Sequence, residues 1–503
     1  MNATDPLLGP MKADESREVG GVRLDIVKAG AARVKRAIYP PGFRWSTHMK
    51  GIAGTGLCMH AHVGFLARGE VHIEYADGCV REFKAPQAVV IEPHNLIAVE
   101  KGRTFPGDTP EDNAYARAAA ALERWIAEGA LLQDSAPSFY AYFQDYAVPG
   151  SSERRVRKGF IGLGKLEDYS ASVVFRHEQT LSAPKADRLE LLRHTRAQTG
   201  QLFMLYADPA HRVDALLEEA ASAVPPAVDV PDEYGVVHRL WPVADPAQVA
   251  EIQRLMASQR LVIADGHHCY ETALNYRDER RAGRAPQPAA PCERAMMTFI
   301  NTHAEGLTIL PTHRVLSSLQ DFSLHRLFGQ LVPYFEIGVH PFDDQRERSL
   351  AYDAFHSHFE KEWCDRSQRR FGIYAGADRT WCGEQAFYIL SLKPGADLAK
   401  LLPGVSRLQR ELDVVLLHRF LLGKCLGISE QAVTAETHVA YEREMEAAVA
   451  AVDHGAAQIA FLLNPVAVEQ VMRIATAGEL LPQKSTDFYP KLLSGITIYR
   501  LED

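Results

Sequence analysis

Helix-like and strand-like segments alternate along the chain from Pro93 to the C-terminus, and few architectures accommodate such an order. Residues 114–132 repeat apolar side chains with a helical period, whereas residues 457–465 form a short apolar run typical of a strand. Amphipathic helices that alternate with strands cover the apolar faces of a sheet, which builds mixed layers. We therefore predict an α/β fold, with mixed sheets and helices, for residues 94–503.

Residues 1–93 have a different pattern. Residues 1–20 are polar and are expected to form a mobile arm. Residues 21–93 contain several short strand-like runs, and Asp77-Gly78 between two of them is a hairpin signal, because glycine accepts a positive φ there. Strands at this spacing predict a small all-β barrel or sandwich. The chain is thus predicted to consist of an arm, a β segment and an α/β region.

The composition excludes several classes of protein. The chain has 503 residues, of which 47% are hydrophobic and 24% charged, a balance typical of a soluble globular enzyme. No apolar run approaches the roughly 20 residues that cross a bilayer, and the N-terminus lacks the basic and apolar stretches of a signal peptide. The net charge of −9 argues against a broad nucleic-acid-binding surface.

The cysteines indicate the redox compartment. Seven cysteines lie far apart along the chain, and no two of them form a C-x-x-C pair. Such a scattered set is typical of reduced thiols, so we expect a cytoplasmic protein. Zinc sites of the finger or ribbon type have no support.

Residues 39–78 contain several histidines and resemble part of the cupin family, from its first histidine motif to the following hairpin. In cupins, histidines on the strands of a jelly-roll barrel bind a divalent metal. The resemblance implies a truncated jelly roll in which His48, His60 and His62 bind a transition metal, with His94 near a later motif position. Imidazole ligands favour zinc or iron. The alternative is that His60 and His62 are strand residues of an incomplete barrel that binds no metal.

Residues 260–283 carry the sharpest local signal. Residues 261–263 form a continuous apolar run, as in a strand buried on both faces. Asp265 is a suitable N-cap, Gly266 allows a tight turn, and apolar residues then recur at helical spacing. The sequence therefore predicts a strand that turns directly into a helix.

Two imidazoles lie in the first turn of this predicted helix. Amide groups at a helix start lack intrahelical acceptors, and the dipole there favours an anion. His267 and His268 could donate to a phosphate or transfer a proton near neutral pH, and Glu271 could orient His267. The alternative is a capped helix with exposed histidines.

The segment ADGHHCYETALNYRDE, residues 264–279, closely resembles the bacterial family called domain of unknown function 1015. The resemblance continues through NLIAVEKGRTFPG, RKGFIGLGKLEDY, HEQTLSAPKADRLELL, LTILPTHRVL, QIAFLLNP and PQKSTDFYPKLLSG. It covers about residues 94–503, and on this basis the chain is identified as a member of that family.

The family is similar to the ParB/sulfiredoxin-like superfamily, which includes free serine kinases, and D-G-H-H looks like its nucleotide-phosphate box. The resemblance implies phosphoryl transfer, by a kinase-like or phosphatase reaction, on a small metabolite such as serine or phosphoserine. It also implies a nucleotide partner and Mg²⁺ with ATP or ADP as cofactors. Asp265, Glu271 and Glu178 are the carboxylates expected to hold that ion together with substrate phosphates.

Further residues complete the predicted anion site. Lys185 and Arg188 lie near the start of a predicted helix, where cations oppose the helix dipole, a conflict that often marks an anion site. Glu178 closes a strand and could accept a substrate hydroxyl proton. More phosphate or substrate contacts are predicted at His313, Arg314, Lys484 and Ser485. For each of these, the alternative is a surface ion pair or a capped loop.

Two departures from the family pattern leave other functions open. Cys269 replaces an arginine whose forked, permanently charged group suits phosphate. The cupin-like segment replaces the usual N-terminal segment of the family. The chain is therefore predicted to be a phosphoryl-transfer enzyme, with two alternatives: a non-catalytic nucleotide or metabolite sensor, or a metal-binding cupin-type protein. DNA binding is disfavoured by the net charge.

Overall fold

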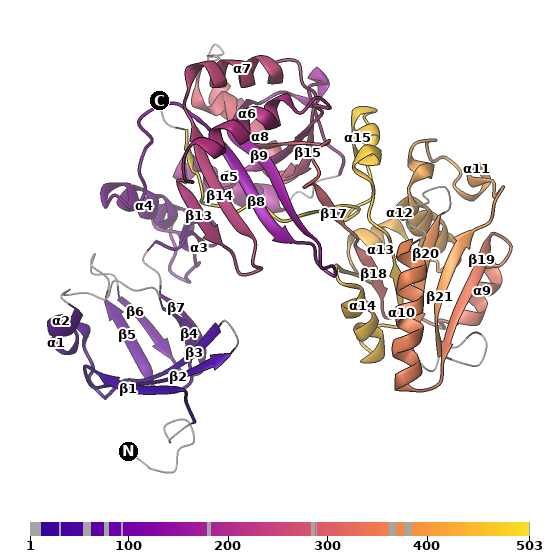
Figure 1. Ribbon diagram of the computed structural model, residues 1–503, viewed down its shortest axis with the longest axis horizontal. Coiled ribbons are helices and arrows are strands. Elements are labelled where there is room, and N and C mark those ends of the chain that lie inside the picture. The colour runs from indigo at the N-terminus through magenta and orange to yellow at the C-terminus, as the bar shows by residue number, and fades with distance from the viewer. Residues whose placement is uncertain are drawn as a thin grey trace. The chain divides into compact units, whose positions relative to one another are not determined.

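The computed structural model describes residues 12–29, 32–53, 62–74, 80–91, 94–178, 183–282, 287, 289–361, 369–376, 381 and 385–501. The chain forms two compact units (Figure 1). One comprises residues 1–101 and 124–131, and the other comprises residues 102–123 and 132–503.

The first unit contains small antiparallel sheets. A meander joins β1 (Glu15–Val19), β2 (Val22–Ala29) and β3 (Ala32–Ile38), and two strand pairs join β4 (His62–Leu66) with β7 (Gln87–Ile91) and β5 (Glu70–Glu74) with β6 (Val80–Lys84). The short helices are α1 (Trp45–His48), α2 (Lys50–Ala53) and α3 (Ile97–Glu100). The described strands do not join into one closed barrel, so the predicted cupin-like jelly roll is not confirmed.

A buried carboxylate links the strands of the meander. Asp25 on β2 is fully buried and accepts hydrogen bonds from Arg36 on β3 (2.6 Å) and from Ser16 on β1 (2.8 Å). A buried charge is tolerated only when it is paired and hydrogen-bonded. Asp25 therefore cross-links all three strands.

The second unit is built first around an eight-stranded mixed sheet of order β10-β15-β12-β16-β9-β8-β14-β13. Its strands are β8 (Phe139–Ala147), β9 (Arg154–Lys165), β10 (Val174–Phe175), β12 (Leu202–Tyr206), β13 (Val228–Pro231), β14 (Val237–Val243), β15 (Leu261–Asp265) and β16 (Arg294–Asn301). Its helices are α4 (Ala114–Ala127), α5 (Ala183–Thr195), α6 (Arg212–Ala223), α7 (Pro246–Met256) and α8 (His267–Arg281), with the 3-10 turns η1 (Tyr169–Ala171) and η2 (Pro291–Glu293).

Side chains of β15 alternate between two cores. Ile263 packs with Met204 and with Tyr270 of α8 on one face of the sheet, whereas Val262 packs with Phe203 and Phe488 on the other. Val262 and Ile263 are fully buried. The apolar run at 261–263 therefore forms a strand covered on both faces, as predicted.

A six-stranded antiparallel sheet of order β19-β21-β20-β23-β18-β22 follows in the chain. Its strands are β18 (His313–Leu316), β19 (Phe335–Phe342), β20 (Arg370–Ala375), β21 (Gln385–Leu392), β22 (Val439–Glu442) and β23 (Ile459–Leu462). Its helices are α9 (Leu324–Leu331), α10 (Gln345–Lys361), α11 (Leu398–Leu401), the 3-10 turn η4 (Gln409–Glu411), α12 (Asp413–Leu416), the π-helix η5 (Leu417–Cys425), α13 (Glu430–Thr434) and α14 (Met445–Asp453). The α10 helix lies along this sheet (Figure 1).

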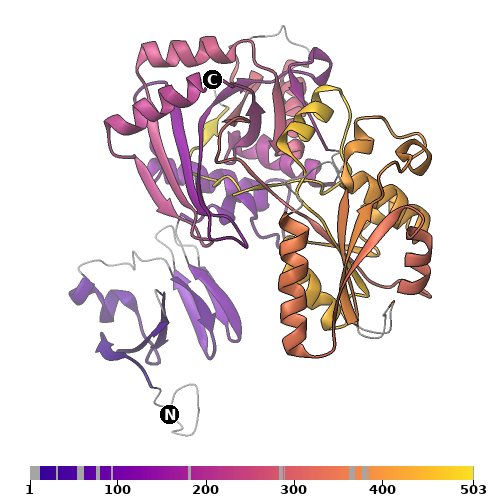
Figure 2. The same cartoon turned by 45° about the vertical axis from the view of Figure 1, so that its right-hand side comes forward.

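The C-terminal segment returns to the eight-stranded sheet. After α15 (Val468–Thr476), β24 (Asp487–Tyr489) pairs with β17 (Thr308–Leu310), and β25 (Tyr499–Arg500) pairs with β11 (Ala197–Gln198). The yellow segment in Figure 2 follows this path. Residues 499–500 are thereby placed beside residues 197–198, which precede them by about 300 positions in the chain.

The α/β prediction for the main region is confirmed by these mixed layers. Among the residues that the structure describes, no helix combines the length and the apolarity needed to span a membrane.

We expect Phe328→Ala to destabilise the six-stranded sheet by about 3–5 kcal/mol, because it removes a buried ring and leaves a cavity. Phe328 is fully buried, and its ring meets those of Trp381 and Tyr388 at centroid distances of 5.3 and 4.9 Å. Denaturant unfolding followed by tryptophan fluorescence measures the change. Leu350→Ala is the control, because Leu350 is exposed and its loss should cost less than about 0.5 kcal/mol. Equal effects of the two substitutions would contradict the assignment of the core.

Candidate functional site

Two neighbouring strands end at the same edge of the eight-stranded sheet. Strands β10 and β15 are parallel, with Val174 opposite Leu261 and Phe175 opposite Val262. The carboxyl ends of parallel strands meet at one edge, which is where ligands bind in open α/β sheets. The residues that follow β10 therefore lie beside the D-G-H-H turn that follows β15.

The turn itself depends on Gly266. Its φ of +93° is a conformation that side-chain-bearing residues rarely adopt. Gly266 occupies the N-cap position of α8, and that helix has no side-chain cap. The prediction that Asp265 is the N-cap is wrong: Asp265 is the last residue of β15. Its carboxylate accepts from the Gly266 amide (2.8 Å) and from the Lys491 ammonium (2.9 Å).

Two imidazoles are buried behind this turn. His177, just after β10, bonds through Nδ1 to the carbonyl oxygen of Ile263 (2.7 Å) and through Nε2 to the hydroxyl of Thr486 (2.9 Å). A carbonyl only accepts, so Nδ1 carries the proton. The ring of His267 lies against that of His177, with centroids 4.7 Å apart.

Burial keeps both rings neutral. It lowers the pKa of His177 to about 4 and the pKa of His267 to about 3. Repulsion between the two rings when both are protonated contributes to the lower pKa of His267. His267 was predicted to serve a phosphate or a proton transfer, but the structure buries it. His268 is only partly buried. Burial lowers the pKa of His268 too, and so does the charge of Lys185.

Glu271 lies against two cations. Its carboxylate lies 2.5 Å from the Lys185 ammonium and 3.4 Å from the Arg176 guanidinium. The role of Glu271 in orienting His267 remains a prediction. The contact does place Lys185 beside the first turn of α8, and Arg188 follows it on α5, partly buried.

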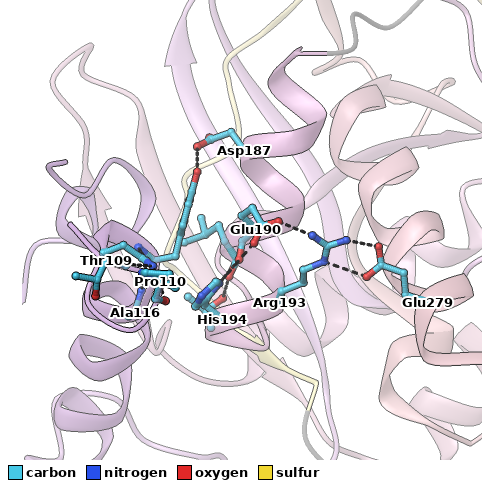
Figure 3. Close-up of polar contacts among 12 residues, drawn as sticks. Thr109, Pro110, Ala116, Asp187, Glu190, Arg193, His194 and Glu279 are labelled. Carbon is cyan, nitrogen blue, oxygen red and sulfur yellow. Dashed lines mark hydrogen bonds and ion pairs between the residues drawn. The ribbon is translucent and has the colours of Figure 1, made fainter. Parts of the chain in front are cut away.

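Helix α5, which carries Lys185, is fixed to its neighbours by polar contacts (Figure 3). Arg193 makes two hydrogen bonds to Glu279 of α8 (3.0 and 2.5 Å) and also pairs with Glu190. Asp187 accepts from the hydroxyl of Tyr115 on α4 (2.9 Å). These contacts hold α5 and α8 together, so Lys185 has a defined position.

The C-terminal loop at residues 482–491 covers the same edge. The amide of Lys484 donates to Glu178 (2.9 Å), Thr486 contacts His177, and Lys491 contacts Asp265. The hydroxyl of Ser485 is buried and donates to the carbonyl of Pro482 (2.5 Å), so it serves the loop itself. The loop therefore adds a polar partner to each of three residues that follow β10 or end β15.

Glu178 lies in an environment that disfavours its charged form. Burial raises its pKa above the ordinary value, the Lys484 amide opposes the rise, and the nearby charge of Asp265 adds to it. A carboxylate whose pKa is raised toward neutrality is better suited to accept a proton at pH 7. The predicted role of Glu178 as a base remains a prediction.

His313 and Arg314 lie inside the protein. Both are almost fully buried, and His313 Nδ1 accepts from the amide of Leu463 (3.1 Å). Arg314 donates to His418 (3.2 Å), to the carbonyl of Lys484 (3.0 Å) and to that of Thr312. Burial lowers the pKa of His313 to about 3 and the pKa of Arg314 to about 10. Where phosphate or substrate contacts were predicted, the structure therefore has a buried arginine that binds the C-terminal loop.

The carboxylates predicted to bind Mg²⁺ do not cluster in the described part of the structure. Among the described residues, Asp265, Glu271 and Glu178 do not form a set whose ligand atoms lie within 4.8 Å of one another. They provide no preformed cage for Mg²⁺, and we derive no step through that ion.

The predicted transition-metal site is only partly described. His48 is exposed, and its Nδ1 lies 3.0 Å from the carbonyl of Arg44. His60 lies outside the described residues, as does the side chain of His62. His94 pairs with Glu128 at 2.9 Å. The metal site therefore remains a prediction.

Three residues of the site escaped the sequence prediction, namely Arg157, Gln144 and Arg176. Arg176 adjoins the predicted Glu178, so proximity to a predicted residue was an available signal for it. Nothing local marks Arg157 or Gln144.

Comparison with known proteins gives one clear match. The model of the family described as protein of unknown function (DUF1015) matches residues 79–415. It begins inside the predicted cupin-like segment. Comparison with curated proteins gives no match.

Solved structures give only remote likenesses. A conserved hypothetical protein from Pyrococcus furiosus has 12% identity and a TM-score of 0.31, covering 68% of this chain and 95% of its own. A free serine kinase in complex with AMP has 12% identity and a TM-score of 0.31, covering 65% of this chain and 86% of its own. Likenesses this weak carry no argument about fold or activity.

The buried imidazoles predict acid lability. An unfolded histidine takes up a proton near pH 6.5, whereas folded His177 does so only near pH 4, since burial lowers its pKa. Its stabilising contribution is therefore complete above pH 6.5 and is lost as the pH falls toward 4, by about 1–2 kcal/mol at pH 5. We expect His177→Gln to flatten the dependence of the thermal midpoint on pH between 7 and 5. Exposed His303 supplies the control, His303→Gln, which should keep the wild-type slope. Identical slopes for all three proteins would contradict the burial argument.

Proposed function

This chain belongs to the family described as protein of unknown function (DUF1015), and we propose that it binds a phosphorylated metabolite or nucleotide at the edge formed by β10 and β15. We further propose that it transfers a phosphoryl group to or from a small metabolite such as serine. The site comprises Glu178, the D-G-H-H turn, Lys185 and the C-terminal loop.

One observation carries the proposal: partly exposed cations lie beside the carboxylates of the D-G-H-H segment, Arg176 and Lys185 at Glu271 and Lys491 at Asp265. The side chains of Arg176, Lys185 and Lys491 are 42%, 25% and 53% exposed. Lysine and arginine are the side chains that bind phosphate most strongly, and an uncapped helix start beside them favours the same charge.

The arrangement assigns a role to each group. Glu178 takes the proton from the substrate hydroxyl. The oxygen of that hydroxyl attacks phosphorus while the bond between phosphorus and the leaving oxygen breaks. Lys185 and Lys491 stabilise the negative charge on the transferring group. His268, partly buried beside Lys185, binds a phosphate oxygen. His267 and His177 remain neutral and support the turn.

Ligand binding is the first requirement. Thermal-shift measurements with ATP, ADP, CTP, serine and phosphoserine, each with and without Mg²⁺, should raise the melting temperature for at least one phosphorylated compound. Absence of any shift at millimolar ligand would refute the proposed function.

For a ligand that binds, we expect Glu178→Gln to lower kcat for phosphoryl transfer by about 100-fold or more, because the amide cannot take a proton. Nucleotide affinity should be kept, since the shape of the side chain is unchanged. The measurement is transfer from radiolabelled ATP to serine. Glu218→Gln serves as control because Glu218 is an exposed residue of α6 that pairs with Lys158. An unchanged kcat in Glu178→Gln would exclude Glu178 as the base.

A second candidate function is a sensor that binds but does not turn over its ligand. The observation that favours it is Cys269, an exposed thiol in the first turn of α8, where the family pattern has an arginine. A thiol offers neither the fork nor the permanent charge of a guanidinium.

Under this second function, Cys269→Arg should tighten nucleotide binding by about tenfold, or produce turnover, because it adds charge-assisted hydrogen bonds. Titration calorimetry measures the affinity, and Cys269→Ser is the control that removes the thiol without adding charge. If Cys269→Arg and Cys269→Ser both bind as the wild type does, the sensor function loses its support.

A further inference from the structure

A fully buried guanidinium lies beneath the C-terminal loop. Arg157 on β9 has no exposed surface, and its group lies over the ring of Phe203 at 4.6 Å. Its Nη2 donates to the carbonyl of Pro490 (2.5 Å), and its Nε donates to Gln144 on β8 (3.0 Å). Among the described residues, no carboxylate forms an ion pair with it, and its Nη1 has no hydrogen-bond partner. Burying an ion that has no paired carboxylate costs free energy, so the hydrogen bonds of Arg157 to Pro490 and Gln144 must offset that cost.

Gln144 forms a hydrogen bond to Lys491, the next residue of the loop. Its side-chain oxygen accepts from Arg157, and its Nε2 donates to the carbonyl of Lys491 (2.9 Å). Two consecutive carbonyls, those of Pro490 and Lys491, are therefore held by two side chains from the middle of the sheet. The backbone at the base of Lys491 is fixed by these bonds.

The other end of Lys491 reaches the D-G-H-H turn. Its ammonium lies 2.9 Å from Asp265 and 3.1 Å from Asp487, and about half of the side chain is exposed. Burial disfavours the charged ammonium, but the charges of Asp265 and Asp487 outweigh it and raise the pKa of Lys491, so the ammonium stays protonated. An ammonium group has three donors, and these carboxylates use two of them.

We infer that Lys491 binds the anionic group of the ligand with its remaining donor, and that Arg157 and Gln144 are positioning residues that hold it for this contact. The inference rests on the proposed function, and it names a cation that supplies the contact from the C-terminal loop. Asp265 and Asp487 orient the ammonium, and the hydrogen bonds from Arg157 and Gln144 fix the backbone of the loop. Little conformational entropy is therefore lost when the ligand binds.

The direct test compares Lys491→Met with the wild type by titration calorimetry with ATP and with phosphoserine. Methionine keeps most of the apolar stem and removes the charge. We expect affinity to fall by about tenfold, the effect of one charge-assisted hydrogen bond, and its salt dependence to become shallower. Lys165→Met is the matched control: Lys165 lies at the far end of β9 in an exposed ion pair with Glu167.

The positioning role is tested with Gln144→Glu, because substitution of Arg157 could prevent folding. Glutamate still accepts from Arg157, and even neutralises it, but cannot donate to the carbonyl of Lys491. We expect unchanged or higher stability together with weaker ligand binding, a combination that a purely structural role would not produce. Gln458→Glu is the control, since the amide of Gln458 also donates to a backbone carbonyl, that of Leu319 after β18 (2.9 Å), and its loss should leave ligand affinity unchanged.

The outcomes separate this inference from the proposed function. If the wild type binds neither ATP nor phosphoserine, the proposed function fails and the inference falls with it. If the wild type binds but Lys491→Met binds equally well, the contact is refuted while the proposed function stands. Equal affinities of Gln144→Glu and the wild type would overturn the positioning role alone.

Discussion

The parallel pairing of β10 with β15 decides which side chains can meet at this site. With the two strands parallel, Glu178 and Asp265 both lie at carboxyl ends and at one edge of the sheet; an antiparallel pair would have placed them at opposite edges. The pairing also brings His177 within reach of the Ile263 carbonyl, so one strand end orients the other. The tight turn at Gly266 then directs α8 away from this edge and leaves its first turn beside both carboxylates.

The C-terminal loop belongs to this arrangement energetically as well as spatially. Arg157 and Arg314 are both buried, both lie over an aromatic ring, and both donate to carbonyls of the loop. A hydrogen bond to a charged group contributes about 1.5–3 kcal/mol, and a buried ion that loses its partners costs several kcal/mol. Displacing the loop would therefore remove a hydrogen-bond acceptor from each of two buried cations. The loop is fixed by the same interactions that make those arginines tolerable.

Local patterns predicted the elements of the site better than its contacts. The apolar run at 261–263, the glycine that follows it and the helical period beyond were sufficient to predict β15, the turn and α8. The strand order could not be read in the same way, because it depends on pairings between residues far apart in sequence. Arg157 is the clearest case. An arginine within a strand is normally expected at the surface. No residue near Arg157 in the sequence indicates that it contacts the distant Pro490. The pairing of Glu271 with Lys185 was missed for a related reason, since helical spacing to His267 was visible in the sequence whereas a partner on another helix was not.

Two kinds of basic residue with different charge states lie at this edge of the sheet: buried histidines and solvent-facing lysines and arginines. The buried imidazoles are neutral at physiological pH, because burial lowers the pKa of His177 and His267 far below 7. The positive charge that faces solvent belongs instead to lysine and arginine side chains. The anion binding proposed for this edge therefore depends on these side chains, whereas the buried histidines govern the stability of the fold in acid. Histidines in a D-G-H-H motif invite the opposite assignment, in which imidazolium groups attract a phosphate. In this structure the buried His267 supports the turn, and the positive charge belongs to Lys185 of α5 and Lys491 of the C-terminal loop.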